Sequence, residues 1–363
     1  MAGHPNPAAS PWWSWAWPFA AWAMIALGLI VGLSNWTAML ATAVLMATVF
    51  AAVYHAEVVA HRIGEPFGTL VLAVAVTIIE VALIVSVVVS APEAKAALAR
   101  DTVFAAVMIV CNGIVGVSLL AGGVRHGVQG FQIEGASAAL AVLAAMTLLT
   151  LVLPNATTSA PGAEFSRSQL IFAGVVSLIL YAAFVFVQTV RHRNFFLPAG
   201  GGSEDQHAAP PSQVAAATSM CILIAALVAV VLLAKLLTPL LEVALARLDA
   251  PVGVVGIVIA GLVLLPEGLA AFRAARADRL QTSLNLALGS ALASIGLTIP
   301  AVAMLSLLLG LRLELGLGYK EQVMLALTLL LSIVTLGTGR TTVLQGIVHL
   351  VVFAAFVFFT VVP

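Results

Sequence analysis

Two glutamates lie in the middle of long apolar runs, where an ionised carboxylate is unfavourable. Glu80 lies in the run 67–90, and Glu267 follows Pro266 directly in the run 253–272. A charge at the centre of a bilayer is costly unless it is paired, protonated or bound to a cation, so both residues are candidates for function. Two carboxylates that share a site of low dielectric cannot both stay ionised. Such a pair holds either a metal cation or protons, which is the minimum chemistry for exchanging one for the other.

Further oxygen atoms accompany each acid. Pro266 has no N–H, so within a helix it leaves the carbonyl of Leu262 without its usual partner. Thr77 lies one turn before Glu80 and brings a hydroxyl, which can also bond to its own helix backbone. Carboxylate, carbonyl and hydroxyl oxygens suit Ca²⁺, Na⁺ or protons and do not suit soft metals. The sequence therefore predicts an ion- and proton-binding site built on Glu80 and Glu267, with Thr77 and Leu262 as further ligands.

The composition identifies the surroundings of these acids. Of the 363 residues, 62% are hydrophobic and only 8% are charged, and the mean hydropathy is +1.16. A soluble domain carries about 25% charged residues, so we expect lipid to be the solvent of this chain. The net charge is zero, which gives no basis for a nucleic-acid partner. The two cysteines lie in apolar runs without disulfide or metal spacing, and we expect no cofactor beyond the transported ions.

Apolar runs of about 20 residues, long enough to cross a bilayer, predict the elements that position the acids. The sequence contains eleven such runs and lacks the basic start and cleavage site of a signal peptide. Trp12, Trp13, Trp15 and Trp17 are typical of an interfacial belt before the first span. We expect a turn at 34–36, and the two longest runs are candidates for tilted or broken helices. The predicted spans are 17–34, 37–56, 67–90, 102–122, 136–153, 168–190, 214–237, 253–272, 282–309, 321–338 and 341–361.

The two halves of the chain are related in sequence. The stretch 57–68 aligns without a gap with 242–253, sharing Glu, Val, Arg, Pro and Gly, and 178–186 aligns with 350–358. Extending the first alignment brings Glu80 opposite Glu267 with a two-residue insertion. These matches indicate an internal duplication. We predict an all-α polytopic membrane protein with these parts: an N-terminal segment and first helix (1–36), a five-helix repeat (37–190), a hydrophilic linker (191–213) and a second five-helix repeat (214–363).

An odd number of helices per repeat makes the second copy enter the membrane from the opposite side. Inverted repeats of this kind are typical of transporters, whose sites lie near the midplane at the repeat interface. The pseudo-twofold axis then relates Glu80 to Glu267.

Arg and Lys number eight on the N-terminal side of the predicted spans and seven on the other, out of 15. The positive-inside rule thus places the N-terminus in the cytoplasm, with a small margin.

The helices that follow the two acids carry polar and small residues. The first has Asn112, and the second has Ser290, Ser294 and Thr298 at intervals of four, which places these hydroxyls on one stripe. Such residues permit close contact between helices or face a cavity.

Several stretches form a recognisable set. They read Gly64-Glu-Pro-Phe-Gly-Thr-Leu, Ile78-Ile-Glu80-Val-Ala-Leu-Ile, Leu264-Leu-Pro-Glu267-Gly and Asn285-Leu-Ala-Leu-Gly-Ser-Ala-Leu-Ala-Ser294-Ile, with Gly339–Leu350 near the end. From about residue 50 onward the chain resembles the ChaA-type branch of the calcium/proton exchangers, in the calcium/cation antiporter superfamily. The resemblance implies proton-driven cation efflux across a bacterial inner membrane. It also implies that Glu80 and Glu267 bind the exchanged ions and that Asn112 and Ser294 are ligands.

The chain departs from that family in ways that leave the cation open. The wider family prefers Gly-Asn-Ala-x-Glu around each acid, whereas this chain has Thr77 and Leu264 in place of the asparagines. Gly268 follows the second acid, where histidine is frequent. Fewer oxygen ligands weaken the binding of Ca²⁺, which takes six to eight. We therefore expect Ca²⁺/H⁺ exchange, with Na⁺/H⁺ or K⁺/H⁺ exchange on the same site as the alternative.

Other polar residues admit two interpretations. Glu57 and Glu242 are duplicated but lie near span ends beside Arg62 and Arg247, so they fit a structural ion pair as well as an ion-entry role. Histidine titrates near neutrality, and His349 is the histidine that the predicted spans place farthest from a loop, which suits a proton relay.

Two other classes of protein are alternatives. An intramembrane hydrolase needs a catalytic acid pair with a positioned water or a zinc motif such as H-E-x-x-H, and the sequence lacks that zinc motif. A passive cation channel is compatible with the duplication, but it does not require paired acids.

Overall fold

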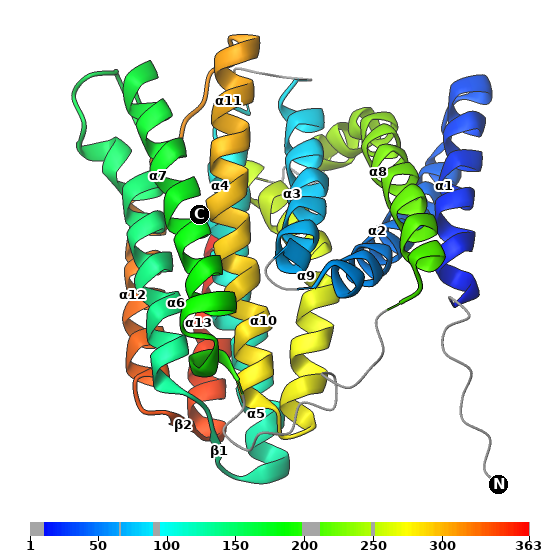
Figure 1. Cartoon of the computed structure of the whole chain (residues 1–363). Helices are drawn as coiled ribbons and strands as arrows, with labels where there is room; N and C mark the ends of the chain where they lie inside the picture. The colour runs from blue at the N-terminus through cyan, green and yellow to red at the C-terminus, as the bar shows by residue number, and fades with distance from the viewer. Residues whose placement is uncertain (1–10, 65–66, 90–94, 198–210, 248–250, 363) are drawn as a thin grey trace, which may run out of the picture. The chain divides into compact units, whose positions relative to one another are not determined.

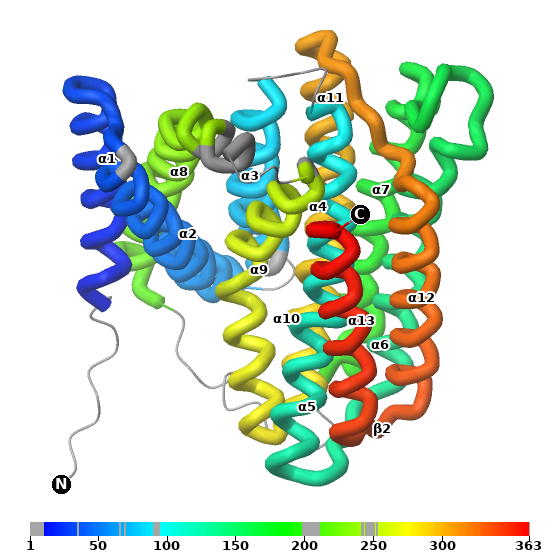
Figure 2. The backbone as a smooth tube through the Cα atoms, turned by 180° about the vertical axis from the view of Figure 1, so that it is seen from behind, coloured from blue at the N-terminus to red at the C-terminus, as the bar shows by residue number. Residues whose placement is uncertain are grey.

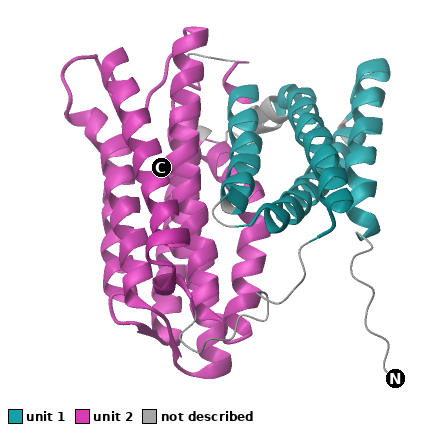
Figure 3. Ribbon diagram, in the orientation of Figure 1, with its two compact units in different colours: residues 1–86, 205–246 teal, residues 87–204, 247–363 magenta. Residues whose placement is uncertain are grey.

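The computed structural model describes residues 11–64, 67–89, 95–197, 211–247 and 251–362. The chain divides into two compact units (Figure 3). Unit 1 comprises residues 1–86 and 205–246, and unit 2 comprises residues 87–204 and 247–363. Each unit thus contains segments from both halves of the sequence.

The all-helical class and the number of spans are confirmed. Among the described residues, eleven helical segments are long and apolar enough to cross a membrane, and each coincides with one of the predicted runs. These segments are 12–31, 36–63, 70–88, 98–126, 133–156, 167–191, 213–240, 253–276, 280–309, 319–336 and 343–361.

Unit 1 contains the first three helices and the eighth. These are α1 (Trp12–Val31), α2 (Asn35–Ile63), α3 (Phe67–Val88) and α8 (Gln213–Arg247) (Figure 1). The buried ring of His55 on α2 bonds through Nδ1 to Ser219 Oγ on α8 at 3.1 Å and through Nε2 to the carbonyl of Ser14 on α1 at 3.1 Å. Ser86 on α3 bonds to Thr238 on α8 at 2.9 Å. Side-chain hydrogen bonds therefore connect helices that are far apart in sequence.

The start of the chain differs from the prediction in two places. Helix α1 begins at Trp12, so the tryptophan cluster lies inside the first helix and not before it. Helix α2 begins at Asn35, so two of the three residues of the predicted turn at 34–36 belong to the helix. A capping box explains this early start, because the backbone N–H of Ser34 donates to Thr37 Oγ1 at 2.7 Å while Ser34 Oγ accepts from the N–H of Thr37.

Unit 2 contains the remaining helices and two short strands (Figures 1 and 2). In chain order the elements are α4 (Leu98–Met108), η1 (Ile109–Ile114), α5 (Val115–His126), β1 (Gln129–Gly130), α6 (Ile133–Thr147), η2 (Leu148–Val152), η3 (Leu153–Ala156), α7 (Arg167–Phe186), η4 (Val187–Arg191), η5 (Arg193–Phe196), α9 (Val252–Arg276), α10 (Leu280–Ala293), η7 (Ser294–Thr298), α11 (Ile299–Leu309), α12 (Tyr319–Leu336), β2 (Arg340–Thr341) and α13 (Val343–Val361).

Contacts between loops are consistent with alternating spans. Strands β1 and β2 pair antiparallel, with Gln129 opposite Thr341. Gln129 Nε2 also donates to Asp278 at 2.8 Å, so the loops after the fourth, eighth and tenth spans gather at one end of unit 2. Other contacts join the loops after the fifth and ninth spans, where Arg312 bonds to Glu164. The loops that follow even-numbered spans thus contact one another, and so do the loops that follow odd-numbered spans. This grouping is expected when successive helices cross a membrane in opposite directions.

Two spans of unit 2 are interrupted by a wider turn. The segments η1 and η7 are π-helical, and each lies inside a helix that otherwise has α geometry. The run 282–309, predicted to be tilted or broken, is thus one continuous helical span with a π-helical turn inside it. In the run 67–90, the described part is continuous α-helix from Phe67 to Val88. The interruption in the span 98–126 was not predicted.

The last helix of each half packs on the interrupted span of the other half. Helix α13 packs on η1 and α5, and α7 packs on η7 and α11. Glycines permit this closeness: a Cβ at Gly346 would lie 2.5 Å from the backbone nitrogen of Leu120, and one at Gly296 would lie 2.7 Å from Tyr181 Cβ. The two halves are therefore interlocked within unit 2.

The beginning of the predicted linker 191–213 has a defined structure. Residues 193–196 form η5, and Phe196 is buried with its carbonyl accepting a hydrogen bond from Asn285 Nδ2 at 2.6 Å. Residues 198–210, which carry most of the Gly, Pro and acidic content of the predicted linker, lie outside the described residues.

Candidate functional site

Glu80 lies on α3 in unit 1 and is almost completely buried, with 1% of its surface exposed. Thr77, one turn earlier, is also buried, and its hydroxyl donates to the carbonyl of Ala73 at 2.8 Å. The Thr77 proton therefore points to its own helix, while its oxygen keeps acceptor capacity. Apolar neighbours on the helix, Ile79 and Ile84, are fully buried as well. The first acid is thus buried on an apolar helix, with one hydroxyl nearby in sequence.

Glu267 lies on α9 in unit 2 and is half-buried. The helix continues through Pro266 from Val252 to Arg276, so the carbonyl of Leu262 has no N–H of a residue 266 to accept from. This turn of α9 packs on η1: a Cβ at Gly268 would lie 3.2 Å from Ile114 Cδ1. A glycine after the acid, where the family often has histidine, therefore permits α9 to approach the π-helical segment.

Asn112 lies on η1 and is completely buried, and its amide bonds to two other helices of unit 2. Its Nδ2 donates to Thr328 Oγ1 on α12 at 2.9 Å, and its Oδ1 lies 3.2 Å from His349 Nδ1 on α13. His349 Nε2 lies 3.1 Å from Thr335 Oγ1 on α12. The structure therefore places Asn112 and His349 in one buried polar cluster, which we call the Asn112–His349 cluster together with Thr328 and Thr335.

Ser294 lies at the start of η7, the π-helical segment in the helix that follows Glu267. Ser294 and Thr298 are buried, with 3% and 0% of their surface exposed, whereas Ser290 is half-buried. π-Helical segments inside α-helices occur frequently at functional sites, because the wider turn alters which side chains share a face. Both candidate ligands of the helices that follow the acids lie on such segments.

The predicted site residues are divided between the units. Glu80 and Thr77 belong to unit 1, whereas Glu267, Leu262, Asn112 and Ser294 belong to unit 2. Of the two outer acids, Glu57 is exposed on α2, and the side chain of Glu242 on α8 lies outside the described residues. In the part of the chain that the structure describes, no group of three or more His, Cys, Asp or Glu residues is arranged to hold a metal ion.

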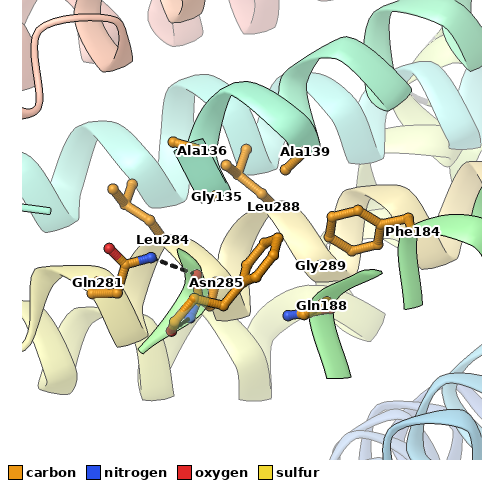
Figure 4. Close-up of a pocket in the computed structure, with 11 residues that line it drawn as sticks. Gly135, Ala136, Ala139, Phe184, Gln188, Gln281, Leu284, Asn285, Leu288 and Gly289 are labelled. Carbon is orange, nitrogen blue, oxygen red and sulfur yellow. Dashed lines mark hydrogen bonds between the residues drawn. The ribbon is translucent and has the colours of Figure 1, made fainter. Parts of the chain in front are cut away.

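Two cavities lie within unit 2. One of about 440 Å³ is lined by charged residues at the start of α4 and α12 and by Pro251 and Gly253 at the start of α9. Glu267 lies 14 residues beyond Gly253, about 21 Å along the helix, so this cavity is distant from Glu267. The other has about 10 Å³, room for one water molecule, between α6, α7 and α10. Beside this cavity, Gln281 donates to Asn285 (Figure 4). Asn285 in turn donates to the carbonyl of Phe196 and so connects α10 to η5.

Sequence reasoning missed two members of the buried cluster, Thr328 and Thr335. A signal was present, because Thr328, Ser332 and Thr335 recur at i, i+4 and i+7 in an apolar helix and therefore share one face. All three are buried. A polar stripe of this kind on a membrane helix predicts a contact with other polar groups.

Comparison with known proteins identifies the family. The model of the family described as sodium/calcium exchanger protein matches residues 33–190 and 218–362, which is most of the chain. The chain belongs to the sodium/calcium exchanger protein family. It is therefore a transmembrane ion antiporter of the calcium/cation antiporter superfamily and not an enzyme.

Individual relatives agree with this membership. The exchanger is 49% identical over 356 residues to the putative ionic transporter y4hA of Sinorhizobium fredii, covering 97% of each chain. It is 36% identical over 315 residues to the sodium-potassium/proton antiporter ChaA of Escherichia coli, covering 86% of this chain and 85% of that one. Its fold is similar to that of the Ca²⁺/H⁺ antiporter protein YfkE, with a TM-score of 0.72 at 16% identity, covering 96% of this chain and 99% of that one.

Proposed function

We propose that this exchanger moves a cation out of the cytoplasm in exchange for protons, with Glu80 and Glu267 as a shared cation and proton site. The observation that carries the proposal is the duplication of an acid at equivalent positions of two apolar runs in a chain of this family. An acid at membrane depth is costly unless it binds a cation or a proton. Because both ligands use the same carboxylates, binding of one excludes the other.

The other candidate residues complete the site in this proposal. Thr77 and the carbonyl of Leu262 add neutral oxygens next to the acids, and Asn112 and Ser294 add polar atoms from the π-helical segments η1 and η7. Glu57 and Glu242, duplicated near the span ends, serve ion entry or hold structural ion pairs. The inverted repeats provide alternating access from each side of a bacterial inner membrane, with the N-terminus in the cytoplasm.

Ca²⁺ is the leading cation, because two carboxylates match a divalent charge and oxygen ligands suit this ion. Na⁺ or K⁺ is the second candidate, and two observations favour it. The relative from Escherichia coli at 36% identity is a sodium-potassium/proton antiporter. In addition, Thr77 and Leu264 stand where the wider family has asparagines, so the site offers fewer side-chain oxygens than Ca²⁺ prefers.

Transport by the purified protein in sealed liposomes tests the function. Ca²⁺, Na⁺ and K⁺ are each added against an imposed pH gradient while internal pH is followed with a dye. We expect at least one cation to drive protons uphill. We expect Glu80→Gln and Glu267→Gln each to reduce this movement to the level of empty liposomes, because glutamine can neither carry a proton nor balance the cation charge.

Glu134→Gln is the matched control, since Glu134 is an exposed acid in the first turn of α6. This variant should transport at the wild-type rate. Full exchange in both Glu80→Gln and Glu267→Gln contradicts the shared site. Downhill cation flow without uphill proton movement in the wild type indicates a passive channel instead.

A further inference from the structure

A polar cluster lies inside the apolar packing of unit 2. Asn112 and His349 are completely buried, as is Thr328, and Thr335 is 3% exposed. They come from three elements, η1, α12 and α13, which pack on one another. Burying an amide and an imidazole is unfavourable unless each polar atom is bonded, so the geometry of these bonds decides what the cluster does.

The bonds fix the orientation of the Asn112 amide. An amide oxygen only accepts, so His349 Nδ1 must donate to Asn112 Oδ1 across their 3.2 Å separation. In the neutral ring Nε2 then accepts from the hydroxyl of Thr335 at 3.1 Å. At its other end the amide donates from Nδ2 to Thr328 Oγ1 at 2.9 Å. The amide is thus held at both ends, and His349 uses one of the two lone pairs of its oxygen.

The other half of the chain shows what the fold itself requires at this place. The alignment of 178–186 with 350–358, extended by one residue, puts Ser177 opposite His349. The packing agrees, since Tyr181 lies against Gly296 of η7 while the aligned Phe353 lies against Gly113 of η1. Ser177 is 1% exposed, so a small hydroxyl satisfies the helix contact in that half. The larger imidazole is therefore a specialisation of the half that carries Asn112.

We propose that His349 is a positioning residue, which holds the Asn112 amide in the orientation that presents its oxygen to the transported cation. The proposal rests on the proposed function, in which Asn112 is a ligand. A ligand that is already oriented loses less conformational freedom when the ion binds. His349 therefore raises the affinity for the cation and leaves the rate of the transport step unchanged.

Kinetics in proteoliposomes separate this role from a structural one. We measure KM and Vmax for Ca²⁺ and for Na⁺ in the wild type, His349→Ser and His349→Gln. His349→Ser copies the residue of the other half and loses the bond to Asn112. We expect it to raise KM roughly three- to tenfold, as expected for one lost hydrogen bond, with Vmax within about twofold of wild type. His349→Gln keeps an N–H donor and should restore KM to within about twofold.

Thr328→Val provides a second route should His349→Ser not fold. Valine has nearly the same shape as threonine and removes the other anchor of the amide, so KM should again rise roughly threefold or more. An unchanged KM in His349→Ser or Thr328→Val overturns the positioning role, as does a His349→Gln that is as impaired as His349→Ser. Wild-type protein without cation-driven proton movement instead overturns the proposed function, and with it this inference.

Discussion

Arg100 shows how a single cation organises the charged end of unit 2. Its Nε donates to Asp101 at 2.8 Å, and its Nη1 donates both to Glu314 at 2.7 Å and to the carbonyl of Gly316 at 2.8 Å. The side chain is 16% exposed and borders the larger cavity. The planar guanidinium serves several acceptors at once, which an ammonium group cannot reproduce in the same geometry. Arg100 therefore fixes the 310–318 loop to the start of α4.

Replacing Arg100 should destabilise the protein markedly. Arg100→Gln removes the positive charge and leaves Asp101 and Glu314 close to each other without it. We expect a cost of about 3 kcal/mol, as for breaking a largely buried ion pair. The measurement is thermal unfolding of the purified protein in detergent.

Arg312→Gln is the control for this prediction. Arg312 bonds to Glu164, but its side chain is 53% exposed, so the change should cost less than about 1 kcal/mol. Equal unfolding midpoints for the two variants would mean that the Arg100 bonds contribute little.

At the scale of elements, α9 carries Glu267 and packs on α4 and η1 through glycines that differ in how much room they leave. A Cβ at Gly256 would lie 2.9 Å from the backbone carbon of Asp101, which has no freedom to move away. A Cβ at Gly261 would meet only Ile109 Cδ1, at 4.0 Å. The distance between α9 and α4 is therefore limited by the close contact near the start of α9, whereas more space remains around the middle of α9.

Alanine at these two positions should have opposite effects. Gly256→Ala forces the helices apart and should destabilise by about 1–3 kcal/mol, as overpacking does. Gly261→Ala fits and should be neutral or stabilise by up to about 1 kcal/mol, through the higher helix propensity of alanine. Thermal unfolding in detergent measures both. A Gly256→Ala variant as stable as wild type would show that α9 shifts without cost.

Hydropathy predicted the helices well because lipid forces every backbone polar group of a span to bond within its own helix. It did not predict η1, because a π-helical turn changes the register of side chains without changing their apolar character. The acids and the π-helical Asn112 were recognisable by type. Their pairing was not predictable: His349 and the polar stripe of α12 are visible in the sequence, but Thr328 and His349 lie 216 and 237 residues away from Asn112, and no local pattern encodes which of these groups meet.

At the scale of the whole molecule, the described residues contain eleven candidate spans, and this odd number puts residues 11 and 362 on opposite sides of a membrane. The sixth span ends at Arg191, so the chain that follows it should lie on the same side as residue 11. With the N-terminus in the cytoplasm, we expect a reporter fused after residue 363 to report the periplasm. Alkaline phosphatase should be active and a green fluorescent protein dark at that position, with the reverse for insertion at 203.

The same activity pattern at both positions would contradict an odd number of spans. If the reporter activities at 203 and after 363 were both the reverse of those expected, the number of spans would still be odd, but the N-terminus would lie outside the cytoplasm. Insertion at 127, after the fourth span, is an internal check and should match 203.

The pairing of Asn112 with α12 and α13 also bears on how the protein is made. A ribosome adds roughly 5–20 residues per second, so Asn112 is synthesised about 10–50 s before His349. During that time its amide has neither Thr328 nor His349 as a partner. Until these helices are inserted, the amide is costly to bury and must bond to other groups, such as water or lipid headgroups. Ribosome pausing before α13 would lengthen this interval.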